Sequence, residues 1–214
     1  KVVVPSTPSD AKGLMATAIR DDNPVVYLHH YMLTLEHGEV PDGEHLVPFG
    51  KAAVRRAGGD LTIVATGWMV HRALAAAEKL AKQGVHAEVI DPRTVAPLDL
   101  ATILKSVSKT GRLLLIDQAP RHVSVSSHIA GDVAQHGFSM LKAPIVQVTA
   151  RDSTVPYSEP LEAYVIPDEA RIIAGAKALL EAKAAPARAS AARASARPAA
   201  KKSAAARRPK PARK

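Results

Sequence analysis

The densest group of polar side chains lies in the segment 117–122, which reads Asp-Gln-Ala-Pro-Arg-His directly after an apolar run. The guanidinium of Arg121 could clamp a carboxylate or a phosphate, and the imidazole of His122 could move a proton or orient a partner. The simpler alternative, a turn at a strand end whose charges face an interface, is favoured. Arg121 and His122 are therefore candidates for an active-site entrance or an interface, and no residue is assigned as catalytic.

Two other loops lie next to a predicted strand or helix and could contact a ligand. In the segment 91–94, Asp91 can cap local backbone amides or pair with Arg93, and this structural role is favoured because Asp-Pro is common turn chemistry. Thr66-Gly67 precedes a helical pattern and could offer backbone amides to an anion. The sequence contains neither GxGxxG nor GxxxxGK[ST], so a nucleotide site has little support.

A metal site is conceivable around His29 and His30, since Glu36 and His37 follow closely. Neighbouring residues of a strand point to opposite faces, so these two imidazoles are not expected to bind one ion together. We assign no metal ligand and no cofactor ligand.

The elements that must position these loops alternate between strand and helix. Thr7-Pro8-Ser9-Asp10 has the cap, the proline and the acid of a helix start, and Gly111 is placed to end a later helix. Strands are predicted at 2–4, 25–28, 61–65, 86–90, 112–116 and 145–148, with a short strand possible at 51–55, and helices at 9–20, 69–82, 99–108, 126–136 and 168–183.

This alternation predicts an α/β fold with three layers, αβα, and a mostly parallel sheet. The run Leu113–Ile116 suggests a strand buried on both faces. A partial βαβ unit precedes this domain, and a boundary is expected in the Pro- and Gly-rich connector that follows it. A strand at residue 1 needs neighbours to pair with, so we expect the chain to be the later half of a larger protein. Ligand contacts should gather at the strands' carboxyl ends, in the loops 66–69, 91–94 and 117–124.

The net positive charge of the chain comes from its end. Residues 186–214 hold ten of the 29 Lys and Arg and no acid, which leaves 19 basic residues against 20 acidic ones in the body. A segment of this composition cannot bury a core and is expected to be disordered. It resembles a basic, histone-tail-like segment that would bind nucleic acid or an acidic partner, with a solubilising extension as the equally favoured alternative.

The chain has no cysteine, which excludes disulfides, thiolate metal sites and Cys nucleophiles and is compatible with a cytoplasmic protein. No apolar run approaches the ~18–20 residues of a membrane span, so no membrane partner is expected.

Several collinear stretches resemble the beta subunit of 2-oxoacid dehydrogenases, the decarboxylating components of the pyruvate, branched-chain and acetoin complexes. The resemblance covers residues 1–183 and is carried by VVPSTPSDAKGL at 3–14, DDNPV at 21–25, VPFGKA at 47–52, TIVATG at 62–67, VIDPRT at 89–94, PLD at 97–99 and VPYS at 155–158.

The resemblance implies a domain organisation and a function. It implies a remnant of a pyrimidine-binding domain at 1–45, a transketolase C-terminal-like domain at 46–183, and the tail at 184–214 outside both. It implies thiamine diphosphate with Mg in the full assembly, held mostly by residues outside this chain. The implied partners are an alpha subunit, a second beta subunit and an acyltransferase core, and the chain alone would be inactive.

Two departures from the family pattern leave the substrate subgroup open. His29 stands where many relatives have an acid, and His122–Ser126 replaces a Gly-rich stretch found in many relatives. The alternatives are a non-catalytic interaction module with a polyanion-binding tail and, more weakly, the matching domain of a transketolase or a deoxyxylulose-phosphate synthase.

Overall fold

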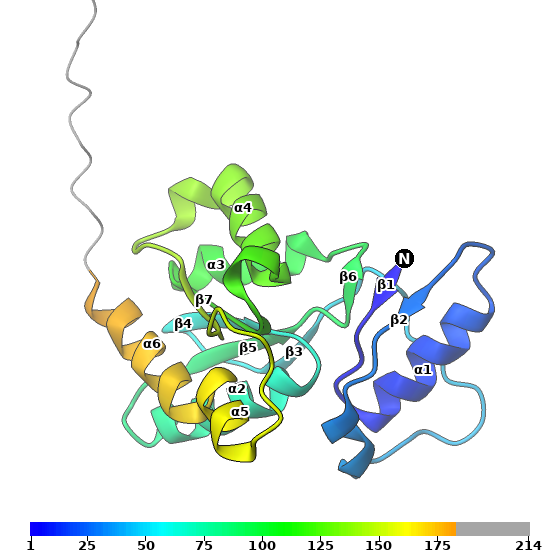
Figure 1. The fold of residues 1–214 in the computed structure, drawn as a ribbon. Coiled ribbons are helices and arrows are strands. Elements are labelled where there is room, and N and C mark those ends of the chain that lie inside the picture. The colour runs from blue at the N-terminus through cyan, green and yellow to red at the C-terminus, as the bar shows by residue number, and fades with distance from the viewer. Residues whose placement is uncertain (183–214) are drawn as a thin grey trace, which may run out of the picture. The chain divides into compact units, whose positions relative to one another are not determined.

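The computed structural model describes residues 1–182, and these residues form two β-sheets flanked by helices (Figure 1). The smaller sheet has the order β2-β1-β6, with β1 at Val2–Val3, β2 at Val26–Tyr27 and β6 at Thr94–Ala96. The larger sheet has the order β3-β5-β4-β7-β8, with β3 at Ala53–Arg56, β4 at Leu61–Ala65, β5 at Ala87–Asp91, β7 at Leu113–Pro120 and β8 at Val146–Ala150.

The first βαβ unit forms as its sequence predicts. Helix α1 (Pro8–Ile19) starts at Thr7, whose side-chain oxygen accepts a hydrogen bond from the Asp10 amide at 3.2 Å. Strands β1 and β2 are parallel, so the helix is a crossover between them. A short 3₁₀ helix, η1 (Tyr31–Leu35), follows β2 inside the segment that was predicted as a connector.

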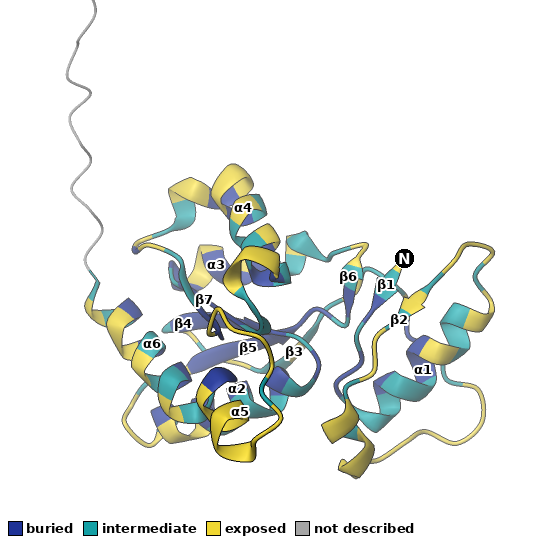
Figure 2. Cartoon of the chain, viewed as in Figure 1, coloured by how far each residue is buried: buried dark blue, intermediate teal, exposed yellow. Residues whose placement is uncertain are grey.

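The larger sheet is mostly parallel, as predicted. Strand β4 pairs in parallel with both β5 and β7, and β7 pairs in parallel with β8, whereas only the edge strand β3 runs antiparallel among the five. All residues of β4 and β5 are buried, and Figure 2 shows these central strands in dark blue. A sheet of this type needs cover on both faces, because its central strands are buried on both sides.

Helices supply that cover. Helices α2 (Trp68–Ala81) and α6 (Glu169–Glu181) pack on one face with Leu114 and Ile116, and helices α3 (Leu100–Thr110) and α4 (Val125–Gly137) pack on the other with Leu113 and Leu115. The predicted burial of β7 on both faces is thus confirmed, and so is the three-layer αβα fold.

The helix ends follow their local chemistry. Asp99 accepts a hydrogen bond from the Thr102 amide at 3.1 Å and starts α3, and Gly111 ends it with φ of 72°. Asp168 accepts from the Arg171 amide at 2.7 Å and starts α6. A side-chain cap at the start and a residue in the left-handed region at the end are the expected devices.

Three features differ from the prediction. Strand β6 and helix α5 (Glu159–Val165) were not predicted, and β7 continues through Pro120, four residues beyond the predicted end at Ile116. The segment from Asp117 to Pro120 was therefore wrongly predicted as loop.

Strand β6 also connects the two sheets. It follows β5 of the larger sheet along the chain and pairs antiparallel with β1 of the smaller sheet. The division into domains at residues 45 and 46 stays a prediction. The predicted disordered tail lies outside the described residues. Within residues 1–182, no helix is both long and apolar enough to cross a membrane.

Candidate functional site

The larger sheet has a topological switch point between β4 and β7. The chain leaves β4 into α2 on one face of the sheet and leaves β7 towards α4 on the opposite face. Neighbouring parallel strands whose connections diverge in this way leave a crevice beyond their carboxyl ends, and ligands of open α/β sheets bind in such crevices.

A hollow of about 160 Å³ occupies this crevice, and we call it the switch-point hollow. Its lining comes from the carboxyl ends of β1, β2, β4 and β7 and comprises Val4, Leu28, His29, His30, Thr66, Gly67, Trp68, Asp117 and Gln118. Parallel strands of both sheets therefore end at one place. Two of the three predicted ligand loops, 66–69 and 117–124, contribute to it.

The ring of His30 is fixed on two sides within this hollow. It stacks on the indole of Trp68 with the ring centroids 5.2 Å apart and the planes inclined by 19°, and its Nδ1 accepts a hydrogen bond from the Met32 amide at 3.1 Å. The guanidinium of Arg72 lies 4.3 Å from the centroid of the same indole. Because Nδ1 is an acceptor, neutral His30 carries its proton on Nε2.

The pKa of His30 is lowered, chiefly because burial disfavours the imidazolium, and the nearby His29 adds to this. A hydrogen bond to the side chain of Gln118 and the charge of Glu162 oppose the shift. The neutral ring is therefore the form present near pH 7.

Asp117 has a local structural role. One carboxylate oxygen accepts from the Ala119 amide at 3.1 Å, and the other accepts from the hydroxyl of Ser124, which is the residue before α4. The hydroxyl of Ser124 also accepts from the Ser126 amide at 2.9 Å and so caps the helix. Asp117, the first residue of the polar segment 117–122, thus holds the connection between β7 and α4 in place.

The sequence-predicted candidates Arg121 and His122 lie outside the switch-point hollow. Both are exposed on the 3₁₀ helix η2 (Arg121–Val123), and they line a wide, open depression of about 440 Å³ together with Ser127, Ala150 and Asp152. The His122 Nδ1 atom lies 3.6 Å from Asp152 Oδ1. We call this surface the Arg121–His122 hollow. Its openness and its exposed charges suit an entrance or an interface.

The third predicted loop, 91–94, holds a buried ionic cluster. Arg55 of β3 lies 2.7 Å from Asp91 and also pairs with Asp10 of α1, and Arg93 reaches the same Asp10 at 3.2 Å. The hydroxyl of Ser6 donates to Asp91 as well. We call these five side chains the Arg55 cluster.

Burial raises the pKa of Asp91, and the charge of Arg55 and the hydrogen bond from Ser6 oppose the shift. Burial alone would lower the pKa of Arg55, but the charges of Asp91 and Asp10 outweigh it, so that pKa is raised. The structural role predicted for Asp91 is confirmed, since it accepts from the Arg93 amide at 3.0 Å, but its ionic partner is Arg55 and not Arg93.

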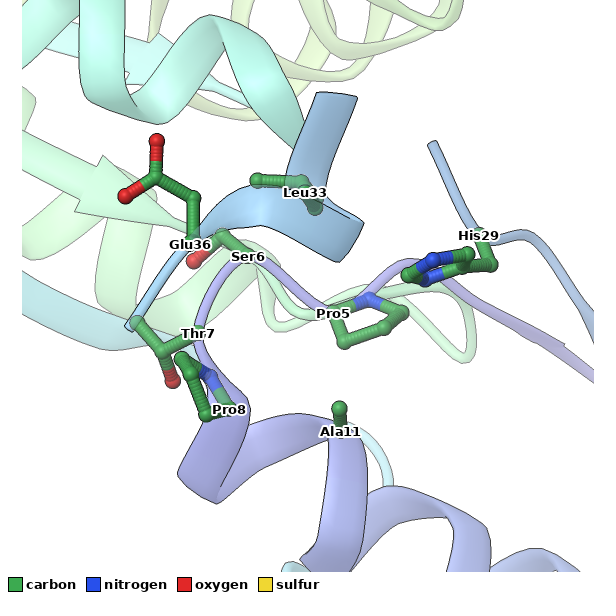
Figure 3. Close-up of a pocket in the computed structure, with 8 residues that line it drawn as sticks. All are labelled: Pro5, Ser6, Thr7, Pro8, Ala11, His29, Leu33 and Glu36. Atoms are coloured by element: carbon green, nitrogen blue, oxygen red, sulfur yellow. The ribbon is translucent and has the colours of Figure 1, made fainter. Parts of the chain in front are cut away.

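A third, much smaller hollow of about 30 Å³ adjoins β1 and α1 (Figure 3). Figure 3 shows apolar side chains around it, with His29 and Glu36 on opposite sides of the view; the lining residues are Pro5, Ser6, Thr7, Pro8, Ala11, His29, Leu33 and Glu36. A space of this size holds about one water molecule. His29 lines both this hollow and the switch-point hollow.

The described residues do not fit thiamine diphosphate with its metal. Among residues 1–182, no three His, Cys, Asp or Glu side chains come together as metal ligands. The switch-point hollow is smaller than the ~300–1,000 Å³ of typical cofactor sites, and the Arg121–His122 hollow is an open depression whose acid is Asp152. No step of a thiamine reaction is therefore assigned to these residues.

The argument that adjacent histidines point to opposite faces does not hold at His29 and His30. Strand β2 ends at Tyr27, so the alternation of a strand no longer applies, and both residues line one hollow. The sequence analysis missed Trp68 and Gln118 as site residues. Both residues lie in loops that were predicted to bind a ligand because they follow strand ends. Which of these loops lie side by side depends on the order of the strands in the sheet.

Residues 50–172 match the family described as transketolase, C-terminal domain. The chain is 48% identical, over 83% of its length and 52% of the relative's, to the acetoin:2,6-dichlorophenolindophenol oxidoreductase subunit beta of Cupriavidus necator. It is 42% identical, over 85% of its length and 56% of the relative's, to the pyruvate dehydrogenase E1 component subunit beta of Bacillus subtilis.

A third relative, the 2-oxoisovalerate dehydrogenase subunit beta of Bacillus subtilis, is 40% identical over 85% of this chain and 56% of its own. The chain thus spans about half the length of these relatives. A solved structure titled split gene transketolase, inactive beta4 tetramer, shares the fold with a TM-score of 0.67 at 24% identity, covering 85% of this chain and 57% of that one.

Proposed function

Because the chain belongs to the transketolase C-terminal domain family, we propose that it is a portion of the beta subunit of a thiamine-diphosphate-dependent 2-oxoacid dehydrogenase. The observation that carries this proposal is identity of 40–48% over more than four fifths of the chain with subunits named for pyruvate, 2-oxoisovalerate and acetoin. The reaction is the oxidative decarboxylation of a 2-oxo acid, followed by transfer of the acyl group to a lipoyl arm.

The division of labour leaves the cofactor to other parts of the assembly. Thiamine diphosphate with Mg supplies the electron sink for decarboxylation when it is bound, and its ligands lie mostly outside this chain. Residues 1–45 are a remnant of the pyrimidine-binding domain, and residues 46–183 are the C-terminal-like domain. This chain contributes subunit contacts and borders the active-site entrance.

Exposed apolar side chains support a role in assembly. They lie at the end of α1, on η1 and in or next to α5, and they include Ile19, Tyr31, Leu35, Tyr157, Leu161 and Tyr164. Large apolar side chains left exposed in this number are consistent with surfaces that a protein partner covers. The proposed partners are an alpha subunit, a second beta subunit and an acyltransferase core. The cytoplasmic location stays a prediction.

The proposal is tested on the complex isolated from the native cells. A tag on the chain should recover an alpha subunit and an acyltransferase identified by mass spectrometry, and the recovered complex should reduce a dye in the presence of a 2-oxo acid and thiamine diphosphate. The purified chain alone should show no turnover. Turnover by the chain alone would refute the division of labour, and a recovered complex without 2-oxo-acid activity would refute the function.

The segregation of charge favours a second candidate function for the tail. We propose that residues 186–214, with ten Lys or Arg and no acid, bind a polyanion such as nucleic acid. If all ten charges contact phosphates, log K for duplex DNA should fall with log salt with a slope of about −9. Removal of residues 186–214 should abolish this slope, whereas an unchanged affinity for DNA and for the acyltransferase core would exclude a role of the tail in binding either.

A further inference from the structure

The connector between η1 and β3 carries the only Asp-Gly pair of the sequence, Asp42-Gly43, and the sequence contains no Asn-Gly pair. Residues 36–44 are all exposed and belong to no helix or strand. In an Asp-Gly pair the side-chain carboxyl can reach the next backbone nitrogen, and glycine has no Cβ to hinder their approach. The pair therefore places an electrophile beside a nucleophile in an open segment.

The Gly43 amide lies in open space. Gly43 has φ of 69°, in the left-handed region that glycine adopts without cost, and a Cβ built on it would meet no atom within 4 Å apart from its chain neighbours. Among residues 1–182, no backbone–backbone hydrogen bond uses the Gly43 N–H, and no ion pair includes the Asp42 carboxylate. These two groups are thus free to approach each other.

The segment is attached to α1 on both sides of this pair. Lys12 Nζ donates a hydrogen bond to the Pro41 carbonyl at 2.6 Å, and Arg20 Nη2 lies 2.7 Å from Glu44 Oε1. The two contacts hold the ends of a short exposed loop, and neither apolar core includes a residue of it. A chemical change in the middle of this loop therefore alters the loop and its two contacts, and it leaves the cores intact.

We propose that Asp42-Gly43 is a site of covalent self-modification, at which aspartate isomerises to isoaspartate. The Gly43 nitrogen attacks Cγ of the neutral Asp42 carboxyl; the N–Cγ bond forms, and the carboxyl hydroxyl leaves as water with the amide proton. Water then adds to either carbonyl of the resulting succinimide ring. Opening at the Cγ carbonyl restores aspartate, whereas opening at the α carbonyl gives isoaspartate, whose backbone runs through the former side chain and is longer by one methylene.

Isoaspartate at this position would be the substrate of a defined class of partner, a carboxyl methyltransferase that uses S-adenosylmethionine. The free α-carboxylate attacks the methyl carbon, the C–S bond breaks, and S-adenosylhomocysteine leaves. The Gly43 nitrogen then displaces methanol from the ester, which returns the site to the succinimide. Because the whole segment 36–44 is exposed, such an enzyme can reach the modified residue. The inference is independent of the function proposed for the whole chain.

Other aspartates of the chain provide an internal comparison. Asp91 is buried and precedes Pro92, whose nitrogen carries no proton to release, so it cannot form the ring. Asp152 is exposed, but it precedes Ser153, whose Cβ crowds the approach. We expect isoaspartate to form at Asp42 faster than at Asp152 by about tenfold or more, which corresponds to a barrier lower by about 1.4 kcal/mol.

Peptide analysis of the full chain tests the proposal. The chain is incubated at neutral pH and physiological temperature and then cleaved after glutamate, which releases residues 40–44 because Glu39 and Glu44 define the cuts. We expect a second chromatographic form of this peptide, with unchanged mass, to accumulate with time and to show the fragmentation of isoaspartate. The incubated chain should also accept methyl groups from labelled S-adenosylmethionine and an isoaspartyl methyltransferase, whereas fresh chain should accept few.

Three variants separate this site from the rest of the chain. Asp42→Glu keeps the charge but requires a larger ring, so it should remove most of the methyl acceptance. Gly43→Ala adds a Cβ beside the nitrogen and should slow isomerisation by about tenfold. Asp152→Glu is the matched control at another exposed aspartate, and it should leave methyl acceptance nearly unchanged. Circular dichroism checks that each variant is folded.

The wild-type chain alone also decides the inference. If the loop leaves the pair free, residues 40–44 should isomerise at similar rates in the folded chain and in the chain unfolded by urea. A much lower rate in the folded chain would show that the native loop holds the two groups apart, and it would overturn the proposal. An absence of isoaspartate at position 42, or equal methyl acceptance by wild type and Asp42→Glu, would overturn it as well.

Discussion

The Arg55 cluster and the Arg121–His122 hollow contain the same kinds of side chain in opposite surroundings. In the Arg55 cluster, Asp91 has 0% of its side chain exposed, and it lies 2.7 Å from Arg55. In the Arg121–His122 hollow, His122 and Asp152 are 62% and 84% exposed and 3.6 Å apart. The first cluster joins α1, β3 and the end of β5, whereas the second decorates an open surface.

The difference shows how burial, and not the density of charged residues along the sequence, sets the energetic weight of a polar group. Exposed ion pairs contribute about 0–1 kcal/mol because water screens them and both side chains lose freedom. A buried pair gives little net stability compared with apolar residues, but removing one partner leaves a charge without compensation and costs about 3–5 kcal/mol. The two regions should therefore respond very differently to the same substitution.

The largest effect is expected at Arg55. Arg55→Met leaves both Asp10 and Asp91 buried without their shared cation, so we expect the free energy of unfolding to fall by about 3–5 kcal/mol. Urea unfolding followed by circular dichroism measures this change.

The matched control is Arg20→Met, since Arg20 pairs with Glu44 on the surface with 54% and 66% of the two side chains exposed. The control should change the free energy of unfolding by about 1 kcal/mol or less. Similar losses in the two variants would show that the Arg55 cluster is no stronger than a surface pair.

An intermediate effect is expected at Asp99, whose side chain is half-buried. Asp99 accepts from the Thr102 amide at 3.1 Å and from the Ala52 amide at 2.9 Å, so it caps α3 and anchors the segment before β3. Asp99→Ala should lower the free energy of unfolding by about 1–2 kcal/mol, and Asp99→Asn, which keeps an acceptor oxygen, should lower it less. Equal losses in the two variants would contradict the capping role.

The pH dependence of this effect follows from the pKa of Asp99. Burial raises it, but the hydrogen bonds from Ala52 and Thr102 outweigh burial, so the pKa is lowered in the folded protein. The stabilisation by the carboxylate is therefore fully present above the unfolded-state pKa of about 3.9 and is lost as the pH falls through the lower folded-state value. The difference between wild type and Asp99→Ala should accordingly shrink below about pH 4, and a difference that is independent of pH would exclude the ionised form as the cap.

Features set by near neighbours in the sequence could be predicted. Thr7, Asp99 and Asp168 each start a helix through a hydrogen bond to an amide three residues on, and the run Leu113–Ile116 is apolar at every position, so burial on both faces follows from the residues alone. Helix α5 was missed because Ser158 supplies no side-chain cap and the helix has a single buried residue, Val165.

Features set by distant pairings could not be predicted. Arg55 meets Asp10 and Asp91 across separations of 45 and 36 residues, and nothing local distinguishes Arg55 from the neighbouring Arg56. In the same way, the stacking of His30 on Trp68 depends on β2 ending beside the turn after β4. The candidates Arg121 and His122 were found because they are close in sequence to other polar residues, and that proximity gives no information about burial.

The smallest effect on stability is expected at the Arg121–His122 hollow, where a partner would make the difference. His122→Ala and Asp152→Ala should each change the free energy of unfolding by no more than about 0.5 kcal/mol, since both side chains are largely exposed. If the surface is an interface, the same variants should nevertheless weaken assembly of the native complex, because a contact that is solvated in the free chain becomes desolvated when the partner binds. Sedimentation of the complex compared with urea unfolding of the chain separates the two effects. A variant that loses stability but assembles normally would show that these residues stabilise the fold and do not form an interface. The two regions would then differ only in how much each side chain contributes to stability.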